Sequence, residues 1–201
     1  MHEACWYSEN EKKGRMTTLG KQVLILAASP RVGGNSDLLA QAWARGAEES
    51  GHKVEKVYLQ RLQIRGCMGC NQCDRTDKPC VQKDGMQEIY TRLEKADVVV
   101  FASPIYFSWF SSQFKACLDR LYAIGHVNGY RYPHKECMLL MTAEDDRPTT
   151  FDLALAYYQR LADHVLKWTD RGSLTVGGVV EKGDVRHTDG LERAYRLGKS
   201  L

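Results

Sequence analysis

The sequence predicts an α/β protein whose parallel sheet is covered by helices on both faces. Two observations indicate this class: strand-length apolar runs alternate with segments of helical periodicity, and the runs Val23–Ala28 and Val98–Ala102 are apolar without interruption. Strands that are buried on both faces have continuous apolar runs of this kind. With 201 residues, 43% of them hydrophobic, the chain has the size and apolar content of one domain with a core.

The elements of the first half follow in order. The first strand, Gln22–Ala28, is followed by apolar residues at helical spacing, which predict a helix that buries Leu38, Leu39, Ala42, Trp43 and Ala47. Alternating polarity in Lys53–Leu59 predicts the second strand. Before the third strand, Ala96–Ala102, a capping-box pattern of Asp84 and Gln87 predicts a short helix with an apolar face of Met86, Ile89, Tyr90 and Leu93.

The second half repeats the strand–helix alternation. We expect Ser103-Pro104 to end the third strand, and an amphipathic stripe then predicts a helix through Phe107, Phe110, Phe114, Cys117, Leu118 and Leu121. The remaining predicted elements are a strand at Glu136–Thr142, a long helix at Phe151–Trp168 with Leu155, Tyr158, Ala162 and Val165 inward, a strand at Ser173–Val180, and a terminal helix that Asp189 and Glu192 cap. Such alternation predicts parallel strands joined by crossover helices.

Residues 21–201 are expected to form this single domain and residues 1–20 an N-terminal extension, of which residues 1–15, before Met16, are either flexible or the product of an upstream start codon. This segment is polar and lacks the apolar central region of a secretory signal peptide. We therefore expect a cytoplasmic protein. No apolar run has the length of a membrane span, and a formal charge of +3 is too small to indicate nucleic-acid or membrane binding.

The loop after the first strand has the composition of an anion site. Two glycines allow its N–H groups to turn inward, the helix start adds free donors, and Ser29, Ser36 and Arg31 supply hydroxyls and a guanidinium. A plain turn with Asn35 or Ser36 as the N-cap is the alternative, but Arg31 favours a phosphate monoester. The loop contains neither a Gly-Lys-Ser/Thr motif nor G-x-G-x-x-G, which argues against ATP hydrolysis and a dinucleotide cradle.

The loop after the third strand places aromatic and apolar groups at the same sheet edge. Tyr106 lies in neither the strand nor the helical stripe, so we expect it to contact a planar ring, whereas Phe110 is expected to pack in the core. On the following helix, Lys115 and Asp119 stand four residues apart and predict an ordinary surface ion pair. The six histidines are dispersed, and no Ser–His–Asp arrangement is readable.

Together these residues resemble a known family. Ser29-Pro30-Arg31 with Gly34-Asn35-Ser36, then Ser103-Pro104-Ile105-Tyr106, then Lys115 with Leu118-Asp119-Arg120 are similar to the NADPH-dependent FMN reductase and iron–sulfur flavoprotein group of the flavodoxin-like fold. The resemblance implies a three-layer sandwich with a five-stranded parallel sheet in the order 2-1-3-4-5. It implies three sets of FMN-binding residues: Ser29, Arg31, Gly34, Asn35 and Ser36 at the phosphate, Pro104, Ile105, Tyr106 and Phe107 at the isoalloxazine ring, and Thr142, Ala143 and Glu144, with Asp145, in a third loop.

Four of the seven cysteines lie in one loop: Cys67, Cys70, Cys73 and Cys80. Three thiolates at every third position and a fourth nearby can complete the ligand set of a [4Fe–4S] cluster, and the loop is similar to the cysteine motif of iron–sulfur flavoproteins. Flavin reductase relatives carry comparable loops without a cluster, so free or redox-active thiols are the alternative. Zinc is a third option, although structural zinc sites usually combine two separated cysteine pairs.

The sequence therefore supports two functions. The first is an FMN-dependent oxidoreductase that passes reducing equivalents from NAD(P)H to a flavin, quinone or other small acceptor; the hydride chemistry belongs to the flavin, so no catalytic residue is assigned. The second is an electron carrier whose [4Fe–4S] cluster exchanges electrons with FMN and a ferredoxin-like donor. A cofactor-free binding module is a weaker third. The resemblance implies a homodimer or higher homo-oligomer.

Overall fold

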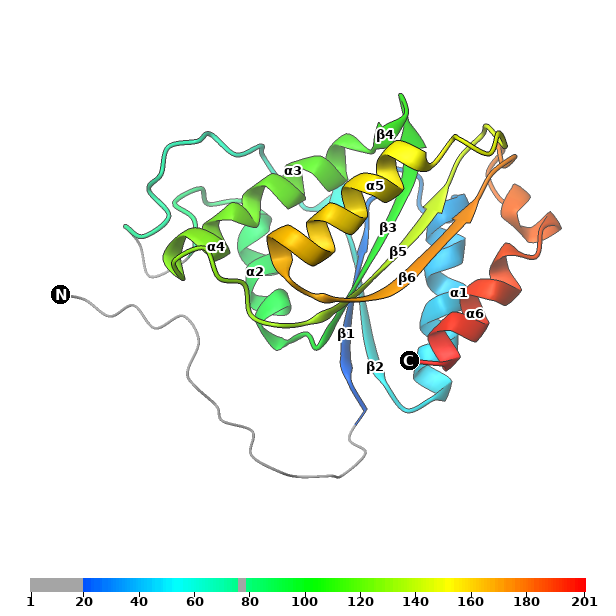
Figure 1. Ribbon diagram of the computed structural model, residues 1–201, viewed down its shortest axis with the longest axis horizontal. Helices are drawn as coiled ribbons and strands as arrows, with labels where there is room; N and C mark the ends of the chain where they lie inside the picture. Colours follow the sequence, from blue (N-terminus) through cyan, green and yellow to red (C-terminus); the bar gives the residue numbers. More distant parts are fainter. Residues whose placement is uncertain (1–19, 76–78) are drawn as a thin grey trace.

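The computed structural model describes residues 20–75 and 79–201 and alternates strands with helices (Figure 1). The predicted extension, residues 1–20, lies outside the described residues except for Gly20. The strands are β1 (Gln22–Ala27), β2 (Lys53–Tyr58), β3 (Val98–Tyr106), β4 (Trp109–Phe110), β5 (Glu136–Thr142) and β6 (Thr169–Val176). The α-helices are α1 (Asn35–Glu49), α2 (Met86–Lys95), α3 (Ser112–Arg120), α4 (Tyr122–Val127), α5 (Asp152–Arg160) and α6 (Gly190–Lys199).

The five long strands are parallel and stand in the predicted order. Their sequence across the sheet is β2-β1-β3-β5-β6, which is 2-1-3-4-5 when only these strands are numbered. A sixth, two-residue strand was not predicted: β4 pairs antiparallel with the end of β3. The carboxyl ends of the parallel strands therefore meet at one edge, where open α/β sheets bind their ligands.

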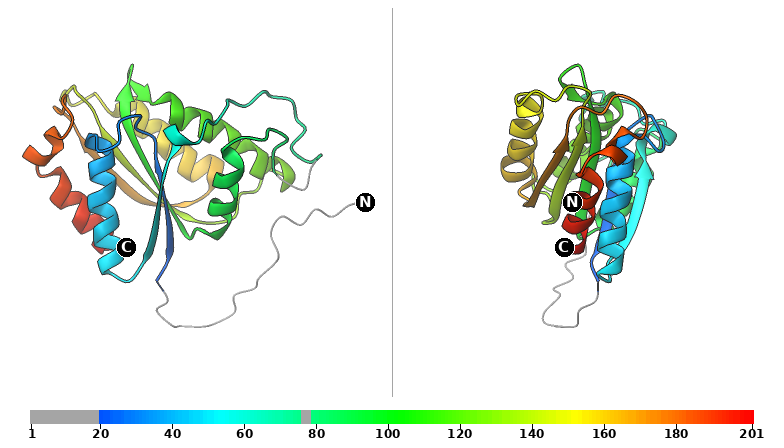
Figure 2. Two further views of the ribbon diagram at one scale, coloured as in Figure 1. Left: turned by 180° about the vertical axis from the view of Figure 1, so that it is seen from behind. Right: turned by 90° about the vertical axis from the view of Figure 1, so that its right-hand side faces the viewer.

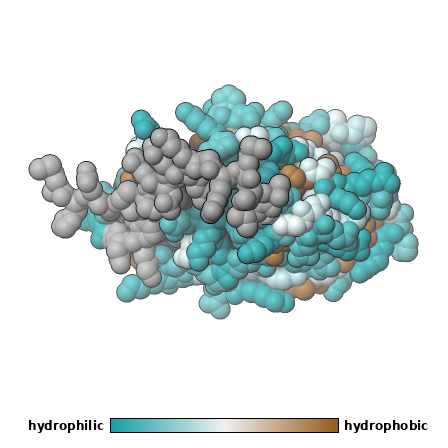
Figure 3. Space-filling view, turned by 90° about the horizontal axis from the view of Figure 1, so that it is seen from below, coloured by the Kyte–Doolittle hydropathy of each residue, from teal (hydrophilic) through white to brown (hydrophobic). Residues whose placement is uncertain are grey.

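Helices cover both faces of the sheet, as predicted. Helices α1 and α6 lie on one face, and α2, α3, α4 and α5 lie on the other (Figures 1 and 2). The side chains of each strand alternate between two apolar cores: in β1, Val23 and Ile25 join the core beneath α1 and α6, whereas Leu24 and Leu26 join the other. Where it is not covered by grey atoms, the face of the molecule that Figure 3 shows from below is mostly hydrophilic.

The third strand does not end at Ser103-Pro104, contrary to the prediction. It continues to Tyr106, turns at Phe107 and Ser108, and returns as β4. Phe107 is therefore not on the following helix, which begins only at Ser112. Ser111 sets that start, because its hydroxyl accepts a hydrogen bond from the N–H of Phe114.

The predicted helix Phe151–Trp168 changes character at its midpoint. It is α-helical over Asp152–Arg160 and π-helical over Leu161–Leu166. Wider π turns shift the inward face, so Tyr158 and Ala162 are buried as predicted but Val165 is exposed. The final long strand correspondingly occupies Thr169–Val176 rather than Ser173–Val180.

The predicted capping box before α2 does not form. The N-cap position is Gly85; Asp84 Oδ1 accepts from the N–H of Met86 at 3.1 Å, and the Gln87 side chain donates to the carbonyl oxygens of Cys80 and Gln82. Gln87 therefore stabilises the preceding cysteine loop and not the helix start. Within the described parts of the chain, no helix combines the length and apolar character needed to cross a membrane.

Candidate functional site

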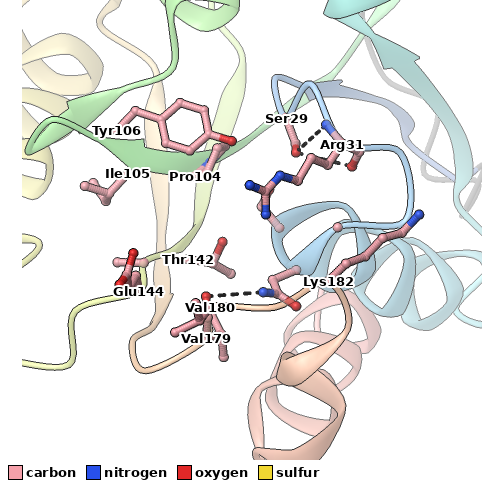
Figure 4. Close-up of a pocket in the computed structure, with 14 residues that line it drawn as sticks. Ser29, Arg31, Pro104, Ile105, Tyr106, Thr142, Glu144, Val179, Val180 and Lys182 are labelled. Carbon is pink, nitrogen blue, oxygen red and sulfur yellow. Dashed lines mark hydrogen bonds between the residues drawn. The ribbon is translucent and has the colours of Figure 1, made fainter.

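One pocket at the carboxyl edge of the sheet gathers almost all the residues that the sequence singled out (Figure 4). It encloses about 140 Å³ between the loops that follow β1, β3, β5 and β6. Eleven of the twelve predicted cofactor residues line it: Ser29, Arg31, Gly34, Asn35, Ser36, Pro104, Ile105, Tyr106, Thr142, Ala143 and Glu144. The twelfth, Phe107, does not line the pocket and stands fully exposed at the turn of the β3–β4 hairpin.

The loop 29–36 forms the polar end of the pocket. Ser29 Oγ accepts from the N–H of Arg31 at 3.1 Å, and the carbonyl oxygen of Arg31 accepts from the N–H of Gly34 at 2.9 Å. A Cβ on Gly34 would lie 2.9 Å from that carbonyl oxygen, so the turn requires a glycine. Helix α1 begins directly after it, at Asn35, and its first N–H groups lack intrahelical partners. Such a helix start attracts anions.

The buried carboxylate of Asp37 stabilises the loop 29–36. Asp37 Oδ2 accepts from the N–H of Gly33 at 2.7 Å, and Asp37 Oδ1 pairs with Lys56 Nζ of β2 at 2.7 Å. Asp37 is almost completely buried, so the ion pair compensates a charge that solvent cannot reach. The pair ties the turn at Gly33 to α1 and β2 and so holds the polar end of the pocket in a defined shape.

The side chain of Asn35 is already occupied by protein partners. Its amide nitrogen donates to the carbonyl oxygens of Val179 (3.3 Å) and Glu181 (2.9 Å), and its amide oxygen accepts from the N–H groups of Gly183 (2.9 Å) and Val185 (3.3 Å). A carboxamide has two donor hydrogens and two acceptor lone pairs, and these four bonds use all of them. Only the backbone N–H of Asn35 is therefore left for a ligand.

The opposite end of the pocket is built by the β3–β4 hairpin. Pro104 and Ile105 are half-buried there, and 40% of Tyr106 is exposed to solvent. Figure 4 shows the Tyr106 ring across the pocket from the loop that carries Arg31. This end offers an apolar and aromatic wall, whereas the other end offers a cation and N–H donors.

Two buried serines connect the hairpin to the loop 29–36. Ser111 Oγ donates to the carbonyl oxygen of Ala28 at 2.8 Å, immediately before Ser29. The N–H of Ser111 donates to Ser103 Oγ at 3.2 Å, which in turn donates to the carbonyl oxygen of Pro104 at 2.9 Å. Because both serines are fully buried, these bonds set the spacing between the two ends of the pocket.

The third loop closes one side of the pocket, and acidic residues follow it. Thr142 is buried at the end of β5; the Ala143 N–H donates to the carbonyl oxygen of Val176 at the end of β6, and its carbonyl oxygen accepts from the N–H of Val179. Next to the lining residue Glu144, Arg147 donates to both carboxylate oxygens of Asp145 and holds the pKa of Asp145 well below its usual value. Asp145 thus serves a local turn.

Three lining residues come from the loop after β6 and were not found in the sequence: Val179, Val180 and Lys182. The sequence placed Val179 and Val180 at the end of the strand Ser173–Val180, whereas β6 ends at Val176, and it assigned no role to Lys182. The signal that could have found them is topological, because the loop after the last parallel strand opens at the same sheet edge as the loop after the first.

The cysteine loop lies away from this pocket, against α2 and α3. Cys73 and Cys80 are buried, and Cys67 and Cys70 are exposed. Burial, and to a smaller extent the neighbouring thiols of Cys80, Cys70 and Cys67, raise the pKa of the Cys73 thiol to about 11. Among the described residues, however, no three histidine, cysteine or acidic side chains are arranged to hold one metal ion.

The two ends of the cysteine loop are fastened together. Arg120 of α3 donates to the Asp84 carboxylate and, at 2.9 Å, to the carbonyl oxygen of Arg65. The N–H of Arg65 donates to Asp84 Oδ2 at 3.0 Å, and the Gln82 side chain donates to the carbonyl oxygen of Gly66 at 3.1 Å. The loop is therefore closed at its base by buried polar contacts that do not involve the thiols.

The comparison with protein families decides where the chain belongs. Residues 22–149, more than half of the chain, match the model of the NADPH-dependent FMN reductase family. The chain is a member of this family. The match includes the loops after β1, β3 and β5, so the resemblance inferred from those loops is confirmed.

Two of the proteins similar to this chain are iron–sulfur flavoproteins. An iron–sulfur flavoprotein of Archaeoglobus fulgidus is 39% identical over 106 residues, which are 53% of this chain and 47% of that protein. An iron–sulfur flavoprotein of Methanocaldococcus jannaschii is 33% identical over 99 residues, 49% of this chain and 51% of that protein. The chain thus spans about half the length of these relatives.

The fold is also found among solved structures. An NAD(P)H:quinone oxidoreductase from Methanothermobacter marburgensis superposes with a TM-score of 0.67 at 23% identity, covering 90% of this chain and 97% of the other. At this identity the likeness shows a shared fold, and it confirms the predicted flavodoxin-like class.

Proposed function

We propose that the protein is an FMN-dependent oxidoreductase that takes reducing equivalents from NAD(P)H and delivers them to a flavin, quinone or other small acceptor. One observation carries the proposal: a single pocket joins an anion-binding loop with Arg31 at one end to an aromatic and apolar wall with Tyr106 at the other. FMN has the same division into a phosphate and a planar ring system. Membership of the FMN reductase family supports this assignment.

The chain's own residues bind and orient the cofactor. The N–H groups at the start of α1 and the Arg31 guanidinium would hold the phosphate, and the hairpin Pro104–Tyr106 would border the ring. FMN bound there would supply the chemistry of hydride transfer between nicotinamide and acceptor. The pocket encloses about 140 Å³, below the roughly 300–1,000 Å³ of sites that engulf a drug-sized ligand. Much of the cofactor would therefore remain open to a co-substrate.

Flavin binding and turnover test this function directly. Purified protein supplied with FMN should bind it with flavin absorption bands near one flavin per chain, and should then oxidise NADPH or NADH when a quinone is added. Arg31→Ala should weaken FMN binding about tenfold or more, because a charge-assisted contact is lost. Ser36→Ala tests the helix start independently. Unchanged FMN affinity in both variants would contradict the site, and failure of the wild-type protein to bind FMN would contradict the function.

An iron–sulfur electron carrier is the second candidate, favoured by the names of the relatives and by four cysteines in one loop. Anaerobic purification followed by iron and acid-labile sulfide analysis separates the two functions. Flavin without iron after attempted reconstitution supports the reductase, whereas about four irons and four sulfides per chain support the carrier. The same preparation, examined by sedimentation velocity, tests the expected homodimer.

A further inference from the structure

Lys182 lies beside the anion-binding loop although it comes from the far end of the chain. Its side chain packs over Gly33: a Cβ placed on Gly33 would lie 3.2 Å from Lys182 Cε and 3.4 Å from Lys182 Nζ. Gly33 has φ +72°, a left-handed conformation that favours glycine, so the space the lysine uses is kept free of a side chain. Figure 4 shows the lysine extending from the loop after β6 toward the loop 29–36.

The backbone on both sides of Lys182 is fixed to the start of α1. The preceding residue, Glu181, gives its carbonyl oxygen to the Asn35 side chain at 2.9 Å, and the following residue, Gly183, gives its N–H to the same side chain at 2.9 Å. Asp184 adds a second brace by accepting from the N–H groups of Val180 (3.0 Å) and Glu181 (2.7 Å). None of these bonds involves the lysine side chain, so the conformation of this loop does not depend on the Lys182 side chain.

Within the part of the chain that the structure describes, the two cations that line the pocket have no acidic partner. In the described ranges 20–75 and 79–201, neither Lys182 nor Arg31 has a carboxylate oxygen within 4.0 Å, whereas Lys56 and Lys21 are paired with Asp37 and Glu136. Both side chains line the pocket beside the start of α1, where the positive end of the helix dipole also favours an anion.

We infer that Lys182 is a second cation of the phosphate site and, together with Arg31, holds a phosphate monoester dianion. This inference rests on the proposed function, because FMN supplies that phosphate. The family match ends at residue 149, so it assigns no role to the loop that carries Lys182. The inference also explains Asn35: its side chain does not contact the phosphate but holds the lysine-bearing loop against the helix that does.

Comparing two flavins tests the inference, because riboflavin has the ring system of FMN without the phosphate. Apoprotein titrated at low salt should bind FMN about tenfold more weakly in Lys182→Gln than in wild type, the loss typical of one charge-assisted contact. Riboflavin affinity should be the same in both proteins. Lys182→Arg should recover most of the FMN affinity, and the difference between wild type and Lys182→Gln should shrink at high salt because ions screen exposed charges.

Lys95→Gln is the matched control, since Lys95 lines a separate hollow beside β1, β2 and α2 and should leave both affinities unchanged. FMN affinity of Lys182→Gln within about twofold of wild type would overturn the inference, because a phosphate contact is worth more than that. Equal losses of affinity for FMN and riboflavin in Lys182→Gln would also overturn the inference, since they would show that Lys182 supports the structure of the site and does not bind the phosphate. If the wild-type protein binds riboflavin and FMN with equal affinity, it has no phosphate site and the inference is wrong. If it binds neither flavin, both the inference and the proposed function are wrong.

Discussion

The guanidinium of Arg120 and the carboxylate of Asp84 form a two-pronged ion pair at the base of the cysteine loop. Arg120 Nη1 lies 2.8 Å from Asp84 Oδ2 and Nη2 lies 3.2 Å from Oδ1, with side chains that are 1% and 6% exposed. The pair raises the pKa of Arg120 and lowers that of Asp84 through hydrogen bonding, against the desolvation that each group suffers. It links α3 to the residues that precede and follow the four cysteines.

Breaking this pair should destabilise the fold strongly. We expect Asp84→Asn to lower the free energy of unfolding by about 3–5 kcal/mol, because the Arg120 charge would remain buried without a counter-charge. Urea unfolding followed by circular dichroism measures the change. Asp119→Asn is the control: it removes the exposed partner of Lys115, a predicted pair that the structure confirms at 2.6 Å, and should cost only about 0.3–0.5 kcal/mol. Similar losses in both variants would contradict the buried pair's role.

The same pair predicts a dependence on pH. Since the pKa of Asp84 is lower in the folded protein than its usual value of 3.8, the ionised carboxylate favours the folded state. The stabilisation is complete well above pH 3.8 and is lost as the pH falls through the lower folded-state value. The difference in unfolding free energy between wild type and Asp84→Asn should therefore be constant from about pH 7 to 5 and narrow below pH 3.8. A difference that narrows above pH 5 would assign the effect to another group.

The buried Ser111 should matter for stability and for the site together. Ser111→Ala removes the N-cap of α3 and leaves the carbonyl oxygen of Ala28 without this donor, so we expect a loss of about 1–3 kcal/mol. FMN affinity should also fall, because the variant loosens the contact between the hairpin and the loop 29–36. Its exposed neighbour Ser112, whose hydroxyl donates to the Gln113 side chain, provides the control Ser112→Ala, which should change neither quantity. Equal unfolding curves for Ser111→Ala and Ser112→Ala would contradict the role of Ser111 in joining the hairpin to the loop 29–36.

Much of the site was predictable because its residues follow strands directly. The loop 29–36 and Thr142–Glu144 come at the carboxyl ends of apolar runs, and the geometry of a parallel sheet brings such ends to one edge. Lys182 was not predictable in the same way. The position of Lys182 depends on the four hydrogen bonds that the Asn35 side chain makes with residues 144 to 150 positions later in the chain. The sequence around Asn35 indicates a helix cap and gives no sign of these long-range contacts.

The fold was predictable to the level of strand order, and the misses have local causes. Ser103-Pro104 reads as a strand end because proline lacks an N–H donor, yet β3 continues because Pro104 remains in register with Thr142 of β5. The exposed Val165 was misplaced because periodicity assumes α-helical turns, and the π-helical segment Leu161–Leu166 breaks that assumption. Both departures come from tertiary contacts that a single periodic pattern does not contain.

The turn of the β3–β4 hairpin stores strain that substitution should release. Phe107 and Ser108 both have positive φ, +48° and +59°, which defines a two-residue type I′ turn that favours Asn-Gly. Phe107→Asn combined with Ser108→Gly should stabilise the fold by about 1 kcal/mol or more, because Phe107 is fully exposed and contributes no packing in return. Urea unfolding of the double variant and of each single variant measures the gain. FMN affinity should stay within about twofold of wild type, because Phe107 lies outside the pocket lining and makes no strong contact there. A large loss of FMN binding would instead place Phe107 against the ring and would show that the strained turn serves the cofactor.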